Sequence, residues 1–307
     1  MRTSGPVKRR IFLGAAAAAP AAVTFLVPGV ASARSLQDAV ARAASASSGD
    51  VAVYARRIGS AVPAVALNAE VQYPAASIIK LLIFVTLYQE VDRRPGLLEA
   101  KIAVKREDFV GGSDVLQNAN PGDTFSLDTV SRAMIDQSDN TASNMLISYF
   151  GVERLNATAR RIGLPNTQIK RHFMDQLAIG QHIQNLTSAR DMGVLLYLIE
   201  RGSREGVFTI ASPRACRAMI DVLLKQEDRD KIARGLPKGT PLANKTGEID
   251  GVRNDVGIVD PLGDSPYVLA VLTKDLNDFS IGNHAIRVIA KAVHAAIGGG
   301  SAAAGPV

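Results

Sequence analysis

A serine and a lysine stand three residues apart, at positions 77 and 80, in an apolar stretch that covers residues 74–88. If this stretch is a helix, Lys80 lies on the same face as Ser77 and one turn further along. An amine that is partly desolvated by neighbours such as Ile83 and Phe84 loses its proton more readily, and can then accept the proton of the serine hydroxyl. The pair therefore fits an activated serine nucleophile. By itself the pair is weak evidence, because a helix cap followed by a lysine that extends its charge to solvent also explains it.

Two further triplets favour the catalytic interpretation. An S-D-N triplet occupies residues 138–140, where two expected helices meet, and a K-T-G triplet occupies residues 245–247, at the end of an expected strand. Each is weak alone, because S-D-N is an ordinary helix start and K-T-G an ordinary strand end. Their occurrence together with the S-x-x-K of residues 77–80, in this order, indicates a single site.

With these three motifs the chain resembles the penicillin-recognising active-site serine hydrolases, above all the class A β-lactamases, which share the set S-x-x-K, S-D-N and K-T-G. The resemblance extends over residues 36–297 in motif order, in spacing and in the order of elements. It implies that Ser77 is the acylated nucleophile and that Lys80 is its activating base or proton relay. It also implies that Ser138 passes a proton to the leaving nitrogen.

The same resemblance implies substrate-binding roles for the residues around these groups. Asn140 would hold the lysine base and the amide side chain of the substrate. Lys245 and Thr246 would contact the substrate carboxylate, for which a cation beside a hydroxyl is well suited. The implied oxyanion hole consists of the backbone N–H groups of the nucleophile and of Glu248. Gly247 belongs to the same substrate-binding segment.

Two features depart from the pattern of class A β-lactamases. Those enzymes carry a glutamate, generally as E-x-x-x-N, in the loop between the second and third motifs, where it positions the water that removes the acyl group. Residues 154–199 contain no glutamate. Glu248 is the second departure, because its carboxylate would repel the substrate carboxylate that Lys245 attracts. Arg253 either adds positive charge for that carboxylate or is a solvated arginine at a strand end.

The loop offers two substitutes for the missing base. Asp175 is the nearest carboxylate and His172 the nearest imidazole, and either could activate the water. Asp175 is shorter than a glutamate by one methylene, which favours the interpretation of a carboxylate that structures the loop. Its surroundings, with M-D at 174–175 and N-L-T-S-A-R-D at 185–191, resemble β-lactamase-related serine hydrolases of unassigned substrate. Without a base, an acyl-enzyme would form and then break down slowly, as in penicillin-binding proteins that react with β-lactams.

Hydrophobic periodicity predicts strands near both ends of the chain and helices between them. The expected strands are residues 50–56, 64–68, 242–246, 256–260 and 267–273, and the main expected helices are residues 35–44, 77–91, 141–150, 152–162, 189–200, 212–226 and 284–297. This order favours an α+β fold, in which an antiparallel five-stranded sheet is completed by both chain ends and flanked by helices. An all-helical lobe would be inserted at about residues 95–225, as in the β-lactamase/transpeptidase-like fold.

The N-terminal segment is typical of an export signal. Residues 8–13 read K-R-R-I-F-L, a twin-arginine pattern, and a mildly apolar run leads from there to A-S-A at 31–33, a cleavage motif. We therefore expect residues 1–33 to be a twin-arginine signal peptide, residues 34–297 a hydrolase domain and residues 298–307 a disordered Gly/Ala tail. The mature protein would be periplasmic or secreted, without stable membrane insertion, since the apolar run is short and contains prolines.

Charge and cysteine content exclude several classes of protein. The net charge of +6 includes four cations in the first ten residues, so the exported part carries only about +2 and lacks the basic stripe of a nucleic-acid-binding protein. Cys216 is the single cysteine, and the four histidines show no H-E-x-x-H pattern, so we expect no metal and no cofactor. As partners we expect a small-molecule β-lactam or a cell-wall peptide, and the protein itself to be a monomer.

These observations predict an exported serine hydrolase of class A β-lactamase type, which opens β-lactam amides through an acyl-enzyme on Ser77. One alternative is a D-alanyl-D-alanine carboxypeptidase or another amide or ester hydrolase on the same scaffold. A second alternative, from a different class, is a weakly catalytic protein that binds cell-wall peptides or β-lactams. A protein that only binds would have no need of both Ser77 and Lys80. For the hydrolase, the sequence supports acylation better than deacylation.

Overall fold

The computed structural model describes residues 1, 28–111, 115–116 and 118–299. The twin-arginine motif and the apolar run of the expected signal peptide lie outside these residues, as does most of the expected tail. Helix α1 (Pro28–Ser45) is continuous across the expected cleavage motif. In the part of the chain that the structure describes, no helix combines the length and the apolar character that crossing a membrane requires.

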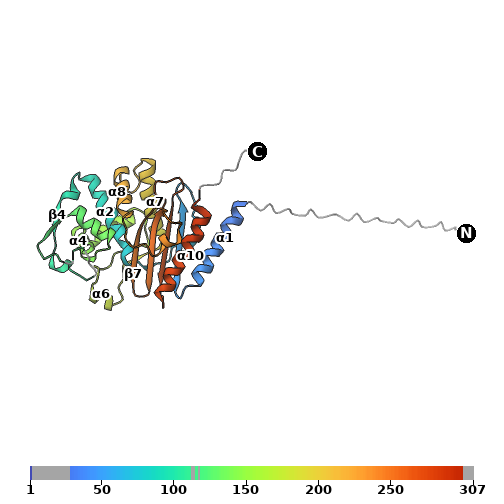
Figure 1. Ribbon diagram of the computed structural model, residues 1–307, viewed down its shortest axis with the longest axis horizontal. Helices are drawn as coiled ribbons and strands as arrows, with labels where there is room; N and C mark the ends of the chain where they lie inside the picture. Colours follow the sequence, from blue (N-terminus) through green and yellow to red (C-terminus); the bar gives the residue numbers. More distant parts are fainter. Residues whose placement is uncertain (2–27, 112–114, 117, 300–307) are drawn as a thin grey trace.

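A five-stranded antiparallel sheet forms the centre of one lobe (Figure 1). The strands are β1 (Asp50–Arg57), β2 (Val65–Leu67), β7 (Leu242–Ile249), β8 (Val252–Val259) and β9 (Tyr267–Lys274). Their order is β2-β1-β9-β8-β7, so strands from the two ends of the chain pair directly, which confirms the predicted fold class. Strand β7 is an edge strand, and it packs against the turn that carries Ser77.

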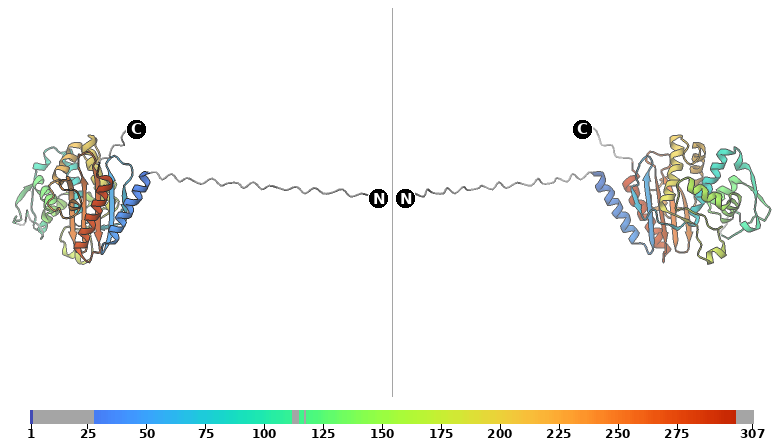
Figure 2. Two further views of the ribbon diagram at one scale, coloured as in Figure 1. Left: turned by 45° about the vertical axis from the view of Figure 1, so that its right-hand side comes forward. Right: turned by 180° about the vertical axis from the view of Figure 1, so that it is seen from behind.

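Helices cover both faces of the sheet (Figures 1 and 2). On one face, α1 and α10 (Phe279–Ile297) lie side by side, with the short α9 (Ile232–Gly235) against α10. An apolar cluster that includes Leu269 of β9 and Ile289 of α10 fills the space between these helices and the sheet. The other face packs on α7 (Ala189–Glu205). The sheet is thus buried on both sides, which makes it a rigid support for the residues at its edge.

The second lobe is built mainly from helices inserted between β2 and β7. They are α2 (Lys80–Arg93), α3 (Leu127–Asp136), α4 (Asn140–Phe150), α5 (Val152–Arg161) and α8 (Pro213–Leu223). Shorter elements connect them: three 3₁₀ helices (Ala76–Ile79, Leu97–Glu99, Arg106–Asp108), helix α6 (Gln176–Gly180), the strand pair β3 (Tyr73–Pro74) with β6 (Leu186–Thr187), and the strand pair β4 (Lys101–Ala103) with β5 (Thr124–Ser126).

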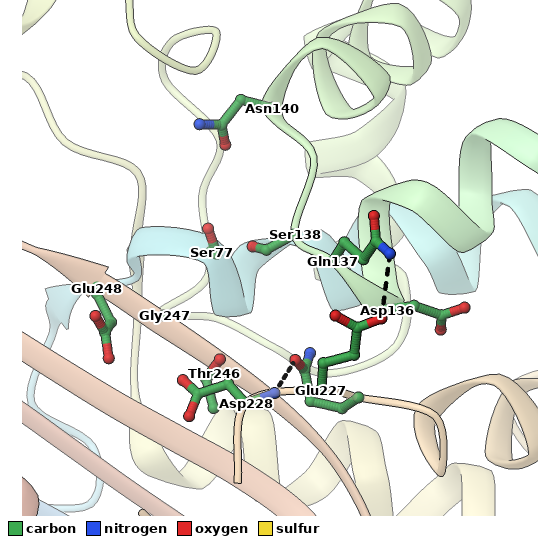
Figure 3. Close-up of a pocket in the computed structure, with 11 residues that line it drawn as sticks. Ser77, Asp136, Gln137, Ser138, Asn140, Glu227, Asp228, Thr246, Gly247 and Glu248 are labelled. Carbon is green, nitrogen blue, oxygen red and sulfur yellow. Dashed lines mark hydrogen bonds between the residues drawn. The ribbon is translucent and has the colours of Figure 1, made fainter. Parts of the chain in front are cut away.

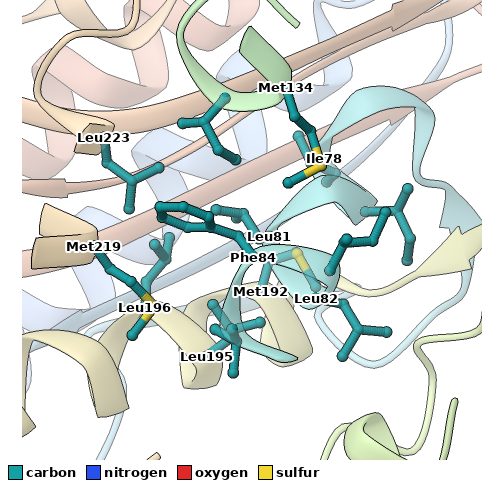
Figure 4. Packing of buried hydrophobic residues seen from close by; sticks show 14 of the residues in the cluster. Ile78, Leu81, Leu82, Phe84, Met134, Met192, Leu195, Leu196, Met219 and Leu223 are labelled. Carbon is teal, nitrogen blue, oxygen red and sulfur yellow. The ribbon is translucent and has the colours of Figure 1, made fainter. Parts of the chain in front are cut away.

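Helix α2 lies in the core of the molecule, and residues 80–90 are all buried. Its sequence is apolar nearly all round, which is the pattern of a helix surrounded by protein. Figure 4 shows Phe84 of α2 packed among side chains of neighbouring helices, including Leu196 of α7 and Met219 of α8. Because the helix is packed on every side, the residues at its N-terminus are held in a fixed position.

Several element boundaries differ from the expectation, and two of them have a clear local cause. Strand β8 begins at Val252 rather than at residue 256, because Gly251, with a φ of 71°, allows a tight turn that pairs Ile249 with Val252. Helix α10 begins at Phe279 rather than at residue 284, because the carboxylate of Asp278 accepts a hydrogen bond from the backbone N–H of Ser280 and caps the helix.

Candidate active site

The expected nucleophile lies in a strained turn. Ser77 belongs to the 3₁₀ helix at Ala76–Ile79, directly before α2, and Ala76 has a positive φ of 46°. A residue other than glycine in that conformation costs about 1–3 kcal/mol and persists only where the surrounding structure imposes it. The Ser77 side chain is partly exposed and borders two cavities. The fold therefore holds this serine at the surface of a cleft.

The Lys80 side chain is completely buried, one turn after Ser77. Its Nζ donates to Ser138 O at 2.5 Å, to Ser138 Oγ at 3.1 Å and to Asn140 Oδ1 at 2.9 Å. Burial lowers the pKa of Lys80 well below its usual value, and the nearby charge of Lys245 lowers it further. The alternative of a lysine that extends to solvent is therefore wrong. Lys80 is instead held among Ser138 and Asn140, and its lowered pKa favours the neutral form that can accept a proton.

Ser138 connects two lysines. Its Oγ lies 3.1 Å from Nζ of Lys80 and 3.0 Å from Nζ of Lys245. Ser138 has a φ of 61°, the left-handed conformation, and in it both the carbonyl and the hydroxyl accept hydrogen bonds from Lys80. Burial lowers the pKa of Lys245 to about 7. A hydroxyl between two amines with lowered pKa values is well placed to relay a proton.

The two other members of the S-D-N triplet position this group. Asp139 caps α4 by accepting a hydrogen bond from Ala142 N at 2.7 Å, and its second oxygen accepts one from Leu116 N at 2.9 Å. Asn140 donates to Gly111 O at 3.2 Å, while its Oδ1 accepts from Lys80. The triplet is thus a helix start, as its composition predicts, and the same local geometry directs Asn140 toward the buried lysine.

The K-T-G strand approaches Ser77 through its glycine. A Cβ atom on Gly247 would lie 2.9 Å from Ser77 N, 3.0 Å from Ile78 N and 3.1 Å from Ala75 O. Side chains do not tolerate such short contacts, so a glycine is required for β7 to pack this closely on the turn. The approach brings an edge strand, whose outer N–H groups are unpaired within the sheet, beside the N–H of Ser77. An oxyanion hole needs backbone donors arranged in this way.

Two cavities meet at Ser77. The larger has a volume of about 330 Å³, and Figure 3 shows the hydroxyl of Ser138 pointing toward Ser77 within it. Five of the other expected site residues line it: Ser138, Asn140, Thr246, Gly247 and Glu248. The smaller, of about 100 Å³, also contains Asn140 and Glu248, and extends to loop residues Arg171, Phe173 and Met174. With Lys80 and Lys245 buried behind the lining, the structure brings eight expected residues together.

Comparisons with known proteins agree with this geometry. Residues 34–297 match the family described as the Beta-lactamase enzyme family. The chain belongs to the β-lactamase enzyme family. The β-lactamase of Streptomyces albus G is 29% identical to this family member over an alignment of 296 positions, which covers 88% of this chain and 90% of that protein.

Solved structures of the family have the same fold. PBP-A is 30% identical with a TM-score of 0.76, and the comparison covers 85% of this chain and 95% of PBP-A. A leucine-to-glutamate mutant of PBP-A, solved as an acyl-enzyme complex with penicillin G, is 29% identical with a TM-score of 0.75, over 87% of this chain and 96% of that one. The β-lactamase fold thus extends over almost the whole described chain.

In this β-lactamase-family protein an aromatic ring of the loop lies beside the buried lysine. The ring centroid of Phe173 is 4.5 Å from Nζ of Lys80. Asn144 of α4 fixes the backbone at this point, because its Oδ1 accepts a hydrogen bond from Phe173 N at 2.8 Å and its amide nitrogen donates to Phe173 O at 3.2 Å. The loop therefore presents an apolar group to Lys80, whereas the resemblance to class A β-lactamases predicts a carboxylate in this loop.

Neither of the two expected substitute bases lines the cavities. Asp175 caps α6, since its Oδ1 accepts a hydrogen bond from Ala178 N at 3.0 Å. The Nε2 atom of His172 lies 3.4 Å from Ser148 Oγ on α4. Both residues are missing from the described residues that surround either cavity. This placement favours the interpretation of Asp175 as a carboxylate that structures the loop.

Lys231 and Asp228, which the sequence analysis did not single out, complete the charge pattern of the site. The ammonium group of Lys231 is buried, 2.5 Å from Asp228 Oδ2 and 2.6 Å from Glu248 Oε1. The only local signal was the three-residue spacing of Asp228 and Lys231, which occurs in many surface turns. The contact with Glu248 joins segments that are distant in sequence, so no periodicity could have predicted it. Glu248 is therefore the partner of a buried cation.

Arg253 lies behind this pair. Its guanidinium donates to Val252 O at 2.8 Å and to Ile249 O at 3.1 Å, and it stacks over the Phe279 ring at 3.8 Å. Only 14% of the side chain is exposed, so the interpretation of a solvated strand-end arginine is wrong. Its Nε lies 3.8 Å from Glu248 Oε2, and Arg253 is not among the described residues that line either cavity.

The described residues contain no group of three or more His, Cys, Asp or Glu side chains that could hold a metal ion. Cys216 is buried, and burial raises the pKa of its thiol to about 11, so it is an unreactive packing residue. The absence of a metal and of a cofactor stays a prediction from the sequence.

Proposed function

We propose that the protein is an exported serine hydrolase that opens β-lactam amides through an acyl-enzyme on Ser77. The main support is the hydrogen-bonded group in which Ser138 Oγ lies within 3.1 Å of both Lys80 and Lys245. Burial of an amine costs free energy, and a protein that only binds its ligand has no use for that cost. In a serine hydrolase the burial has a purpose, because it keeps the amine neutral and a neutral amine is the base that the serine requires.

We infer the acylation step from these contacts and from the position of Lys80 one turn after Ser77. Neutral Lys80 accepts the proton of Ser77 as Oγ forms a bond to the carbonyl carbon of the amide. The backbone N–H groups at the Ser77 turn and β7 stabilise the negative oxygen. When the C–N bond breaks, Ser138 gives its proton to the leaving nitrogen and takes one from Lys80, 3.1 Å away. Lys245, in contact with the same hydroxyl, stabilises the negative charge that develops on it.

Hydrolysis of the acyl-enzyme has weaker support. The loop presents Phe173 to Lys80, and the carboxylate of Asp175 is engaged in capping α6. Without a positioned base, water attacks the ester slowly. We infer that the acyl-enzyme forms faster than it is hydrolysed.

This inference favours a second candidate, a D-alanyl-D-alanine carboxypeptidase or related amide or ester hydrolase, for which β-lactams would act as slowly released inhibitors. The likeness to the PBP-A mutant that was solved as an acyl-enzyme with penicillin G supports it. The twin-arginine pattern of residues 8–13 supports export, and we propose a monomeric mature protein that meets its substrate outside the cytoplasm.

Mature protein mixed with a chromogenic cephalosporin tests the proposal, with absorbance and intact mass followed together. We expect a covalent adduct in the wild type, lost more slowly than it forms, and no adduct in Ser77→Ala. Ser280→Ala, which changes an exposed serine at the start of α10, is the matched control and is expected to behave as the wild type. Rapid multiple turnover would show an efficient β-lactamase instead. If the wild type gives neither adduct nor turnover, the acyl-enzyme proposal is refuted.

A further inference from the structure

We propose that Glu248 is a specificity-determining residue, which occupies Lys231 and so disfavours substrates whose leaving group carries a carboxylate. Amides or esters with an uncharged leaving group then acylate the enzyme faster, so within the second candidate the inference favours a related amide or ester hydrolase over a D-alanyl-D-alanine carboxypeptidase, whose leaving group carries a carboxylate. The inference rests on the proposed function, because it concerns the group that departs when Ser77 is acylated.

The leaving group occupies the larger cavity. Ser138, which supplies the proton to the leaving nitrogen, lines this cavity and not the smaller one. Four carboxylates share the lining: Asp136, Glu227, Asp228 and Glu248. The described residues of the lining include no lysine and no arginine. A leaving group with a carboxylate would therefore enter a cavity that is negative at its surface.

Lys231 is the cation that could offset this charge, and it is already paired. Its side chain is 1% exposed and lies between Asp228 at 2.5 Å and Glu248 at 2.6 Å. Burial acts to lower the pKa of Lys231, but the hydrogen bonds to the two carboxylates outweigh burial and raise it. Two carboxylates thus share one ammonium group. The Glu248 side chain, 44% exposed, presents the remaining negative charge where the two cavities meet.

The two other cations near Glu248 provide little compensation. The Arg253 guanidinium donates to two carbonyl groups of the β7–β8 turn and stacks on Phe279. Lys245 donates to Ser138 Oγ, and burial lowers the pKa of Lys245 to about 7, so at neutral pH it is charged only part of the time. A carboxylate on the leaving group would meet one partly charged lysine and several carboxylates.

Benzylpenicillin and its methyl ester test this, because they are the same β-lactam with and without the carboxylate. The readout is the ratio of their second-order acylation rate constants, acid over ester, from intact mass. In Glu248→Gln, which keeps the size of the side chain and removes its charge, we expect this ratio to rise about tenfold, as for one unit charge several ångströms away in a solvated cleft. Glu248→Asp keeps the charge and is the matched control, with the ratio of the wild type.

The double variant Glu248→Gln/Lys231→Met tests the part played by Lys231. In it, the rise of the acid-over-ester ratio seen in Glu248→Gln should disappear. Because loss of a buried lysine can prevent folding, added NaCl gives an independent readout. The raised acid-over-ester ratio of Glu248→Gln should fall as salt screens the charge of Lys231, which the substitution has freed. If adducts still form but the acid-over-ester ratio is unchanged in Glu248→Gln, the inference is overturned and the proposed function stands. Failure of both penicillins to form an adduct in every variant overturns the proposed function, and the inference with it.

Discussion

A Gly247→Ala substitution tests whether the close packing of β7 on the Ser77 turn sets the acylation rate. The added Cβ would lie 2.9 Å from Ser77 N and 3.1 Å from Ala75 O. Heavy atoms make favourable contact at about 3.5–4.0 Å, so the strand or the turn must move by about 0.5–1 Å. Both contacts are backbone atoms, which cannot rotate away as the end of a flexible side chain can.

A displacement of about 1 Å in a reacting group costs roughly 10²-fold in rate, so we expect the second-order rate constant of acylation to fall by about that factor. Overpacking should also lower the free energy of unfolding by about 1–3 kcal/mol. Acylation by a chromogenic cephalosporin and urea unfolding measure the two effects on one preparation. Gly180→Ala is the matched control, because no atom lies within 4 Å of its added Cβ, and we expect neither effect there.

The acylation rate is measured at urea concentrations well below the unfolding midpoint, so that reduced stability alone cannot lower it. A folded Gly247→Ala protein that is acylated at the wild-type rate would refute the reasoning. It would show that the strand and the turn can separate without moving the groups that react. A comparable loss in Gly180→Ala would likewise count against it, because the effect would then not depend on the contact with Ser77.

Three further outcomes are expected. Burial lowers the pKa of Lys245 to about 7, so the charged form of this lysine prevails below that pH. Acylation by benzylpenicillin should therefore fall as the pH rises through 7. Acylation by the methyl ester of benzylpenicillin, which lacks the carboxylate, should not fall. Phe173→Glu places a carboxylate beside Lys80 and should shorten the lifetime of the penicillin adduct about 10²-fold, measured by intact mass; an unchanged lifetime would contradict this. Asp175→Asn should keep the cap of α6, because asparagine caps a helix about as well as aspartate, and should leave that lifetime unchanged, whereas a longer lifetime would identify Asp175 as the base.

Local patterns were sufficient to predict most elements of this fold. Alternation of apolar residues and nearby Gly or Pro residues predict strands and turns, because both act over a few residues. The start of α2 was less predictable. Its first turn is a 3₁₀ helix with Ala76 at positive φ, because strand β7 packs against it at Gly247. Such strain arises from a contact between distant segments, and intrinsic propensity contains no sign of it.

By itself, the sequence determined that Ser77 and Lys80 share one face of a helix, one turn apart, since that relation depends only on spacing and helix geometry. It also determined that the S-D-N triplet begins a helix, through the capping preference of its residues. The tertiary structure alone decided that Lys80 is fully buried, that Ser138 contacts two lysines and that Glu248 is paired with Lys231. The physical reason is that the charge state and the partners of a side chain depend on burial and on distant segments, neither of which is encoded in the local pattern.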